Sequence, residues 1–171
     1  REKTEELLEF CGLIDFRRRT VRKLSGGMKR KLMVCRALLT EPEILLLDEP
    51  TAGMDALSRR QMWNLLRQLN DHNLTILLTT HYMEEAESLC QRVAFMDRGR
   101  LEEVSEPKKM VEQLGHFAVD EMTSDGLKSH YFKNREDAIA HLSRLTGQTA
   151  LRNTTLEDVF VARAEQKERQ R

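Results

Sequence analysis

The sequence feature that most constrains the fold is a run of four aliphatic residues that ends in two acids, ILLLDEP at residues 44–50. A short apolar run bounded by a turn residue is typical of a strand that is buried on both faces of a sheet. A second run of this kind, LTILLTT, follows at residues 74–80, and a third strand is expected in RVAFMD at residues 92–97. Helical stretches separate these strands, which predicts a parallel sheet with crossover helices, the α/β class.

Two helices flank the first strand in this prediction. Large apolar residues recur at helical spacing before it, at Met28, Leu32, Cys35 and Leu39. We expect that helix to end before Pro42, because a proline disfavours the helical conformation in the residue that precedes it. The next helix is expected from about Ala56 to Leu69, with Asp55 as its N-cap.

The pattern changes in the last third of the sequence. Two strands are expected at residues 117–123 and 127–133, joined as a hairpin. A strand at residues 148–153 then leads into a final helix, whose start is predicted from the capping box Thr154-x-x-Glu157. Apolar residues at core spacing in that helix are Leu156, Val159, Phe160 and Ala164.

These elements divide the chain into three expected parts. Residues 1–40 form a helical segment, residues 41–105 form the core part with the predicted parallel strands, and residues 106–171 form a small α+β accessory domain. Composition adds little, since 28 basic and 28 acidic residues cancel and favour no class of partner. The longest unbroken apolar run is four residues, too short to span a membrane. Cysteines are few and lack metal-binding spacing, so we expect reduced core residues at Cys11, Cys35 and Cys90.

Asp48 and Glu49 are the first candidate site, because ligands gather beyond the carboxyl ends of parallel strands. Asp48 can hold Mg²⁺, which prefers oxygen ligands and keeps much of its water. Side chains alternate along a strand, so Glu49 points elsewhere and is free to orient or deprotonate an attacking water. The two acids could equally begin a turn, and the pattern alone leaves both interpretations open.

Two further candidates follow from single motifs. Ser25, Gly26 and Gly27 come directly before the amphipathic helix, where backbone N–H groups and the helix dipole favour an anion such as a phosphate. His81 directly follows the second strand and can donate a hydrogen bond to a phosphate oxygen or a water. Each motif alone is also compatible with an ordinary loop.

Four motifs in order carry a family resemblance. LSGGM, ILLLDEP, AGMD and TTH occur in this sequence, and with them the chain resembles the ATP-binding cassette (ABC) family of nucleotide-binding subunits over roughly residues 4–105. LSGGM resembles the signature motif of that family, ILLLDE its Walker B motif, AGMD its D-loop and His81 its switch histidine. Met28 departs from the commonest signature residue, glutamine. GLIDFRRRTVRKLSGGMKRKL, HYMEEAE and TTLEDVF are similar to ATPases of ABC-2-type exporters of drugs, antibiotics and polysaccharides.

The resemblance implies a fold and a reaction. The fold would be the C-terminal part of an ABC-type P-loop NTPase cassette, with a parallel-sheet core, part of the helical signature subdomain and an α+β accessory domain. The reaction would be Mg²⁺-dependent ATP hydrolysis coupled to export. In it Asp48 would hold the metal, Glu49 would act as the general base, and His81 would contact the γ-phosphate and the attacking water.

The resemblance also implies partners. Two cassettes would pair head-to-tail, with Ser25, Gly26 and Gly27 binding the γ-phosphate held by the partner. Asp55, in the D-loop, would contact the other subunit. An integral membrane permease subunit would complete the assembly at the cytoplasmic face of the membrane, with this chain attached peripherally.

One expected motif is missing from the sequence. Family members hold the triphosphate on a P-loop, GxxGxGK[ST], but no glycine here is followed by lysine. We expect that the N-terminal half of the cassette was lost or not included, and that this chain alone has no appreciable ATP turnover. Without the early strands, the strands at 43–48 and 74–80 would expose apolar edges.

Two other functions stay open on the sequence. Residues 17–36 hold nine cations and no acid, a pattern that suits either nucleic acid or a solvated face that attracts nucleotide phosphates. Nucleic acid is not the expected partner, because aromatic residues that could stack on bases are scarce nearby. A degenerate regulatory cassette that lends its signature motif to a competent one is the other alternative. The nine cations are Arg17, Arg18, Arg19, Arg22, Lys23, Lys29, Arg30, Lys31 and Arg36.

Overall fold

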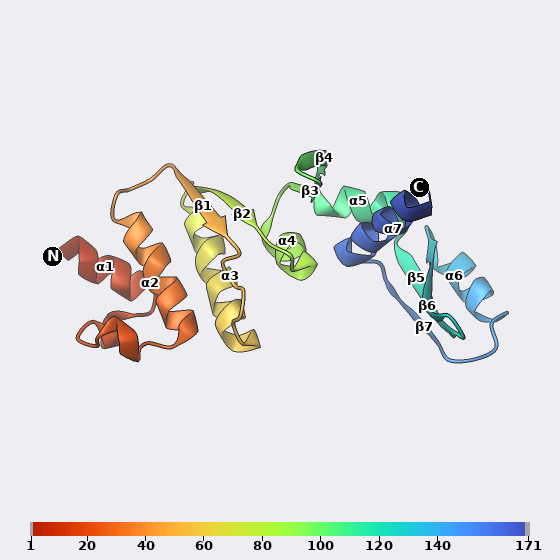
Figure 1. The fold of residues 1–171 in the computed structure, drawn as a ribbon, viewed down its shortest axis with the longest axis horizontal. Coiled ribbons are helices and arrows are strands. Elements are labelled where there is room, and N and C mark those ends of the chain that lie inside the picture. The colour runs from red at the N-terminus through yellow and green to blue at the C-terminus, as the bar shows by residue number, and fades with distance from the viewer. Residues whose placement is uncertain (1, 170–171) are drawn as a thin grey trace. The chain divides into compact units, whose positions relative to one another are not determined.

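The computed structural model describes residues 2–169. These residues form two compact units, of which the first ends at His81 and the second begins at Tyr82 (Figure 1). The expected division into residues 1–40, 41–105 and 106–171 remains a prediction.

The first unit pairs two parallel strands with neighbouring helices. Strands β1 and β2 run in parallel with Asp48 opposite Thr79, which confirms the predicted parallel pairing. Asp55 caps α3 as expected, because its Oδ1 accepts a hydrogen bond from the backbone N–H of Ser58 at 2.9 Å. The elements are α1 (Glu2–Phe10), the short 3-10 turns η1 (Ile14–Phe16) and η2 (Val21–Lys23), α2 (Gly26–Leu38), β1 (Ile44–Asp48), α3 (Ala56–Asp71) and β2 (Thr75–Thr79).

The expectation that these strands are buried on both faces is wrong. Leu45 is 5% exposed, whereas Leu46 is 71% and Leu77 is 64% exposed. The sheet has two strands, and alternate side chains of each strand point to opposite faces. One row of aliphatic side chains is therefore covered, and the other faces outward.

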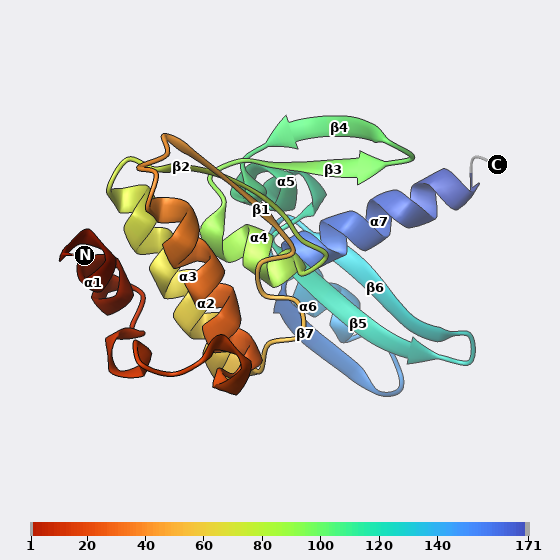
Figure 2. The same cartoon turned by 60° about the vertical axis from the view of Figure 1, so that its left-hand side comes forward.

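The core face of α2 also differs from the predicted one. Its buried residues are Val34, Cys35 and Leu38, and the helix ends at Leu38. Leu39, expected in the core, is 39% exposed. The helix packs against both α1 and α3, so its buried stripe is set by two neighbours and not by its own apolar spacing alone (Figure 2).

The second unit contains two small antiparallel sheets and four helices within residues 82–169. RVAFMD, grouped above with the parallel sheet, instead pairs antiparallel with the strand that follows it. The predicted hairpin is confirmed, with Thr123 opposite Gly126 at its turn. The elements are α4 (Met83–Leu89), β3 (Val93–Asp97), β4 (Arg100–Ser105), α5 (Pro107–Leu114), β5 (Phe117–Thr123), β6 (Gly126–Phe132), α6 (Arg135–Leu142), β7 (Thr149–Asn153) and α7 (Leu156–Arg169).

A hydrophobic core joins β3, α5 and α7 in this unit. Phe95, Met110, Leu156 and Val159 are its buried members. Phe160 is 43% exposed and lies outside this set of buried residues, contrary to its expected core position. Strand β5 lies between β6 and β7 in the three-stranded sheet.

The capping box of α7 is shifted by one residue from the predicted Thr154 and Glu157. The carboxylate of Asp158 accepts hydrogen bonds from the backbone N–H of Thr155 at 2.8 Å and from its hydroxyl at 3.0 Å. Thr154 is buried, and its N–H donates to the carbonyl of His116 at 3.0 Å. A tertiary contact therefore occupies the residue that the local pattern assigns to the cap.

Between residues 2 and 169, none of the helices is both long and apolar enough to cross a membrane.

Candidate functional site

The carboxyl ends of β1 and β2 bring three predicted residues to one edge of the sheet. His81 Nδ1 lies 2.7 Å from Glu49 Oε2. Asp48, one residue before Glu49, ends β1 directly opposite Thr79. The side chain of Glu49 is 35% exposed and that of His81 is 61% exposed, although the Oε2 atom of Glu49 is itself buried. A carboxylate and an imidazole are thus within ion-pair distance of each other at this edge.

Glu49 adopts an unusual backbone conformation. Its φ is 48°, in the left-handed region that non-glycine residues rarely enter. Such a residue costs of order 1–3 kcal/mol and persists where the surrounding structure demands it. The chain turns sharply here, directly after β1, and the turn directs Glu49 differently from the strand residues before it.

The sequence analysis did not identify Thr79, although this residue forms hydrogen bonds with both Asp48 and Glu49. Its hydroxyl donates a short hydrogen bond to the carboxylate of Asp48. Its carbonyl accepts a hydrogen bond from the backbone N–H of Glu49 at 3.0 Å. The only sequence signal was its place two residues before His81, because the register between two strands cannot be inferred from one sequence.

The LSGG residues form a second group at the start of α2. Ser25 is the N-cap, and its Oγ accepts a hydrogen bond from the backbone N–H of Met28 at 3.2 Å. Gly26 and Gly27 are the first residues of the helix. The hydroxyl hydrogen of Ser25 stays available for donation, and the helix N-terminus favours a negative charge.

Gly27 lies so close to a neighbouring helix that it also has a packing role. A Cβ at this position would lie 3.0 Å from Ser58 Oγ and 3.1 Å from Ser58 Cβ. A Cβ at Gly26 would meet nothing within 4 Å. The starts of α2 and α3 therefore touch at Gly27, and the two helices run side by side (Figures 1 and 2).

Asp55 belongs to this second group through Ser58. Ser58 donates to the Asp55 carboxylate twice, from its hydroxyl at 2.6 Å and from its backbone N–H at 2.9 Å. These two hydrogen bonds lower the pKa of Asp55 below its ordinary value, the side-chain bond being the stronger cause. Ser58, a second residue that sequence reasoning missed, thus links the AGMD segment to the LSGG segment within one chain.

The site fits a magnesium ion better than a metal held by protein groups alone. In the described part of the chain, no cluster of three or more His, Cys, Asp or Glu side chains is arranged to hold a metal. Asp48 offers an exposed carboxylate that already accepts one hydrogen bond from Thr79. Mg²⁺ is usually held by one or two carboxylates together with waters and phosphate oxygens. The donor set therefore suits Mg²⁺ held largely by water or ligand oxygens better than a structural zinc site.

Comparison with known proteins shows which family the chain is similar to. Residues 1–52 match the protein family described as ABC transporter. The chain is 39% identical over 176 aligned residues to the Nod factor export ATP-binding protein I of Burkholderia pseudomallei, covering 91% of this chain and 58% of that protein. It is 32% identical to the linearmycin resistance ATP-binding protein LnrL of Bacillus subtilis, covering 85% of this chain and 47% of that protein. The chain thus spans about half the length of the curated relatives it matches.

Solved structures agree with the sequence relatives. The ADP conformation of an ATP-binding cassette of an ABC transporter matches with a TM-score of 0.61 and 25% identity, over 66% of this chain and 44% of that one. An inward-facing structure of a putative metal-chelate type ABC transporter matches with a TM-score of 0.61 over 75% of this chain. Its identity of 20% supports the fold alone. The expected fold class, the C-terminal part of such a cassette with an α+β addition, is confirmed.

Proposed function

Because this chain belongs to the ABC transporter family of ATP-binding proteins, we propose that it contributes catalytic and nucleotide-binding residues to Mg²⁺-dependent ATP hydrolysis coupled to export. The observation that carries this proposal is the 2.7 Å contact between His81 Nδ1 and Glu49 Oε2 at the ends of two parallel strands. The proposed substrate of this chain is ATP. The exported compound would be contacted by the membrane subunit.

Each residue of the strand edge has a proposed role. Asp48 holds Mg²⁺, which neutralises phosphate charge when it is bound. Glu49 takes a proton from the attacking water, since its side chain is partly exposed and a backbone hydrogen bond to Thr79 holds the residue in position. His81 keeps the Glu49 carboxylate oriented and donates toward the γ-phosphate. Most of the rate enhancement then comes from positioning and charge stabilisation.

The second group is proposed to act on a nucleotide held by another subunit. Ser25, Gly26 and Gly27 present a helix N-terminus to the γ-phosphate, and Asp55 contacts the partner cassette. The sequence has no GxxGxGK[ST] segment, so a triphosphate needs a P-loop from elsewhere. We therefore propose a head-to-tail pair of cassettes bound to a permease at the cytoplasmic face of the membrane, and no appreciable turnover by this chain alone.

The proposal is tested by removing the general base. In a polypeptide where this sequence follows a P-loop segment, Glu49→Gln is expected to lower ATP turnover by about 10²–10⁴-fold. Glu84→Gln, an exposed residue on α4, is the matched control and should keep normal turnover. Nucleotide affinity should persist in both variants, because the amide is isosteric with the carboxylate.

Two results would contradict the proposal. Turnover by Glu49→Gln close to that of the parent protein would remove Glu49 from the reaction. Calorimetric titration of the 171-residue chain with Mg-ATP that gives micromolar affinity would show that no further phosphate cradle is needed. If the parent polypeptide binds a second, competent cassette but never hydrolyses ATP, the regulatory alternative is favoured instead.

A further inference from the structure

The loop between α1 and α2 carries an unusual concentration of positive charge. We call its five cations the basic loop cluster, and all five are exposed. The stretch from residue 16 to residue 40 contains no acid, although the chain as a whole has a formal net charge of zero. The cluster consists of Arg17, Arg18, Arg19, Arg22 and Lys23.

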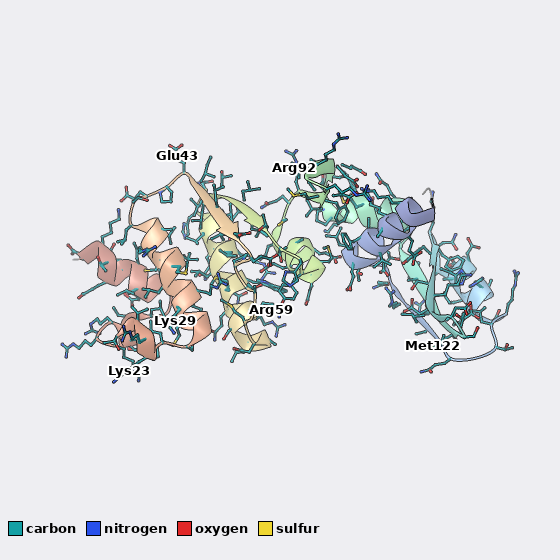
Figure 3. The ribbon with its side chains drawn as sticks, viewed as in Figure 1. Lys23, Lys29, Glu43, Arg59, Arg92 and Met122 are labelled. Carbon is teal, nitrogen blue, oxygen red and sulfur yellow. The ribbon has the colours of Figure 1, made fainter. Side chains whose placement is uncertain are left out.

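These cations have no carboxylate partner among residues 2–169 within ion-pair distance. Arg17 donates to the carbonyl of Ile14 at 3.3 Å, and the guanidinium of Arg19 lies 4.9 Å from the centroid of the Phe16 ring. In the second unit, by contrast, Lys167 lies 2.9 Å from Asp97. The basic loop cluster therefore presents its charge outward, and Figure 3 shows Lys23 at the lower edge of the first unit in that view.

An apolar side chain lies within the basic loop cluster. Val21 is 56% exposed, and Arg22 and Lys23 follow it directly in the 3-10 turn η2. An exposed aliphatic residue with cations on neighbouring positions of the same loop suits the boundary between lipid headgroups and acyl chains, where apolar atoms leave water while the charges stay at the surface.

We propose that the basic loop cluster docks the first unit onto an anionic lipid bilayer. Each Lys or Arg near such a surface raises the association constant about fivefold at moderate salt, and the effect falls off within a Debye length. Clusters of four to eight cations are the size that recognises anionic headgroups. Such docking is separate from nucleotide hydrolysis and requires no ATP.

The described residues favour a bilayer over a nucleic acid. Loops that bind single strands stack bases on free aromatic rings. Phe16 is the aromatic residue of this loop, and its ring already carries the guanidinium of Arg19. Val21 offers aliphatic surface but no ring for stacking. A lipid surface uses both the charge and the aliphatic side chain.

Vesicle co-sedimentation of the full chain tests the proposal. The vesicles are phosphatidylcholine alone, or phosphatidylcholine with about one-third phosphatidylserine. The test variant combines Arg17→Gln, Arg18→Gln and Arg22→Gln, and it keeps the contact between Arg19 and the Phe16 ring. The control variant combines Lys128→Gln, Lys133→Gln and Arg144→Gln, three exposed cations of the second unit, and makes the same change of net charge.

We expect the parent chain to bind the anionic vesicles and to lose binding at about 0.5 M salt. The test variant should bind at least about tenfold more weakly, and the control variant like the parent. Circular dichroism should show both variants folded, because all six side chains are exposed.

Three results would overturn the proposal. Equal binding to vesicles without phosphatidylserine would show that anionic lipid is not recognised. An equal loss in the control variant would show that only net charge matters. Tighter binding to a DNA or RNA oligonucleotide than to the anionic vesicles, lost in the same test variant, would assign the basic loop cluster to nucleic acid.

Discussion

Thr79 stands opposite Asp48 in the parallel pairing of β1 and β2, and its hydroxyl donates a hydrogen bond to the Asp48 carboxylate. The same residue accepts the backbone N–H of Glu49 through its carbonyl. One threonine thus fixes the proposed metal ligand by its side chain and the proposed general base by its backbone. This arrangement separates the two functions experimentally, because a substitution removes only the hydroxyl.

We predict that Thr79→Val raises the Mg²⁺ concentration needed for half-maximal ATP turnover by about tenfold, in a polypeptide that also carries a P-loop. The reason is the loss of a hydrogen bond to a charged group, which typically contributes about 1.5–3 kcal/mol. Thr79→Ser keeps the hydroxyl and should restore the parent value. An equal shift in the serine variant would indicate a packing defect instead of a positioning role.

Gly27 and Gly26 should respond differently to the same substitution. Gly27→Ala places a methyl group 3.0 Å from Ser58 Oγ, which is held by its 2.6 Å hydrogen bond to Asp55. We expect it to be less stable than Gly26→Ala by about 1 kcal/mol, since the Gly26 methyl meets open space. Urea unfolding measures the difference. Equal stability of the two variants would mean that Ser58 moves aside without cost.

Arg152 holds two carboxylates together in the second unit. It donates to Asp120 at 2.7 Å and to Asp158 at 2.7 and 2.8 Å. Burial would raise the pKa of Asp158, but hydrogen bonds from Arg152 and Thr155 outweigh it and lower that pKa. The pKa of Asp120 is likewise lowered, by Arg152 and Ser129 against the effect of burial.

The lowered pKa values predict acid sensitivity. A carboxyl group whose pKa is lower in the folded state contributes stability above its unfolded pKa, and that stability is lost as the pH falls through the folded value. The free energy of unfolding should therefore fall below a pH of about 4. Asp158→Asn should flatten this fall, and Asp125→Asn, in the exposed hairpin turn, should leave it unchanged. Parallel pH profiles for Asp158→Asn and the parent would contradict the prediction.

Arg152→Met should destabilise the same unit at neutral pH by about 2 kcal/mol. Removing one partner of a buried ion pair costs about 3–5 kcal/mol, but the Arg152 side chain is 36% exposed and water screens part of the effect. The loss should shrink at low pH, where both acids are protonated.

Local patterns predicted the elements whose boundaries depend on neighbouring residues. The aliphatic runs at β1 and β2, the Asp55 cap and the hairpin between β5 and β6 all follow from residues a few positions apart. The predictions were wrong where contacts between distant segments determine strand pairing or the position of a cap. Strand β3 pairs with β4 and not with the parallel sheet, and Asp158 takes the capping position because Arg152 and Thr155 hold it inward.

The candidate site likewise has one part that the sequence predicted and another that only the structure shows. The amino-acid sequence by itself determined that Asp48 ends a strand, that Glu49 and His81 come directly after strands and that Ser25 precedes a helix, because strand and helix signals act over short distances. Only the tertiary structure decided that Thr79 faces Asp48, that His81 contacts Glu49, and that Ser58 fills the space beside Gly27. The physical reason is register: the alignment of one strand or helix against another depends on packing between distant segments, and a single sequence does not record it.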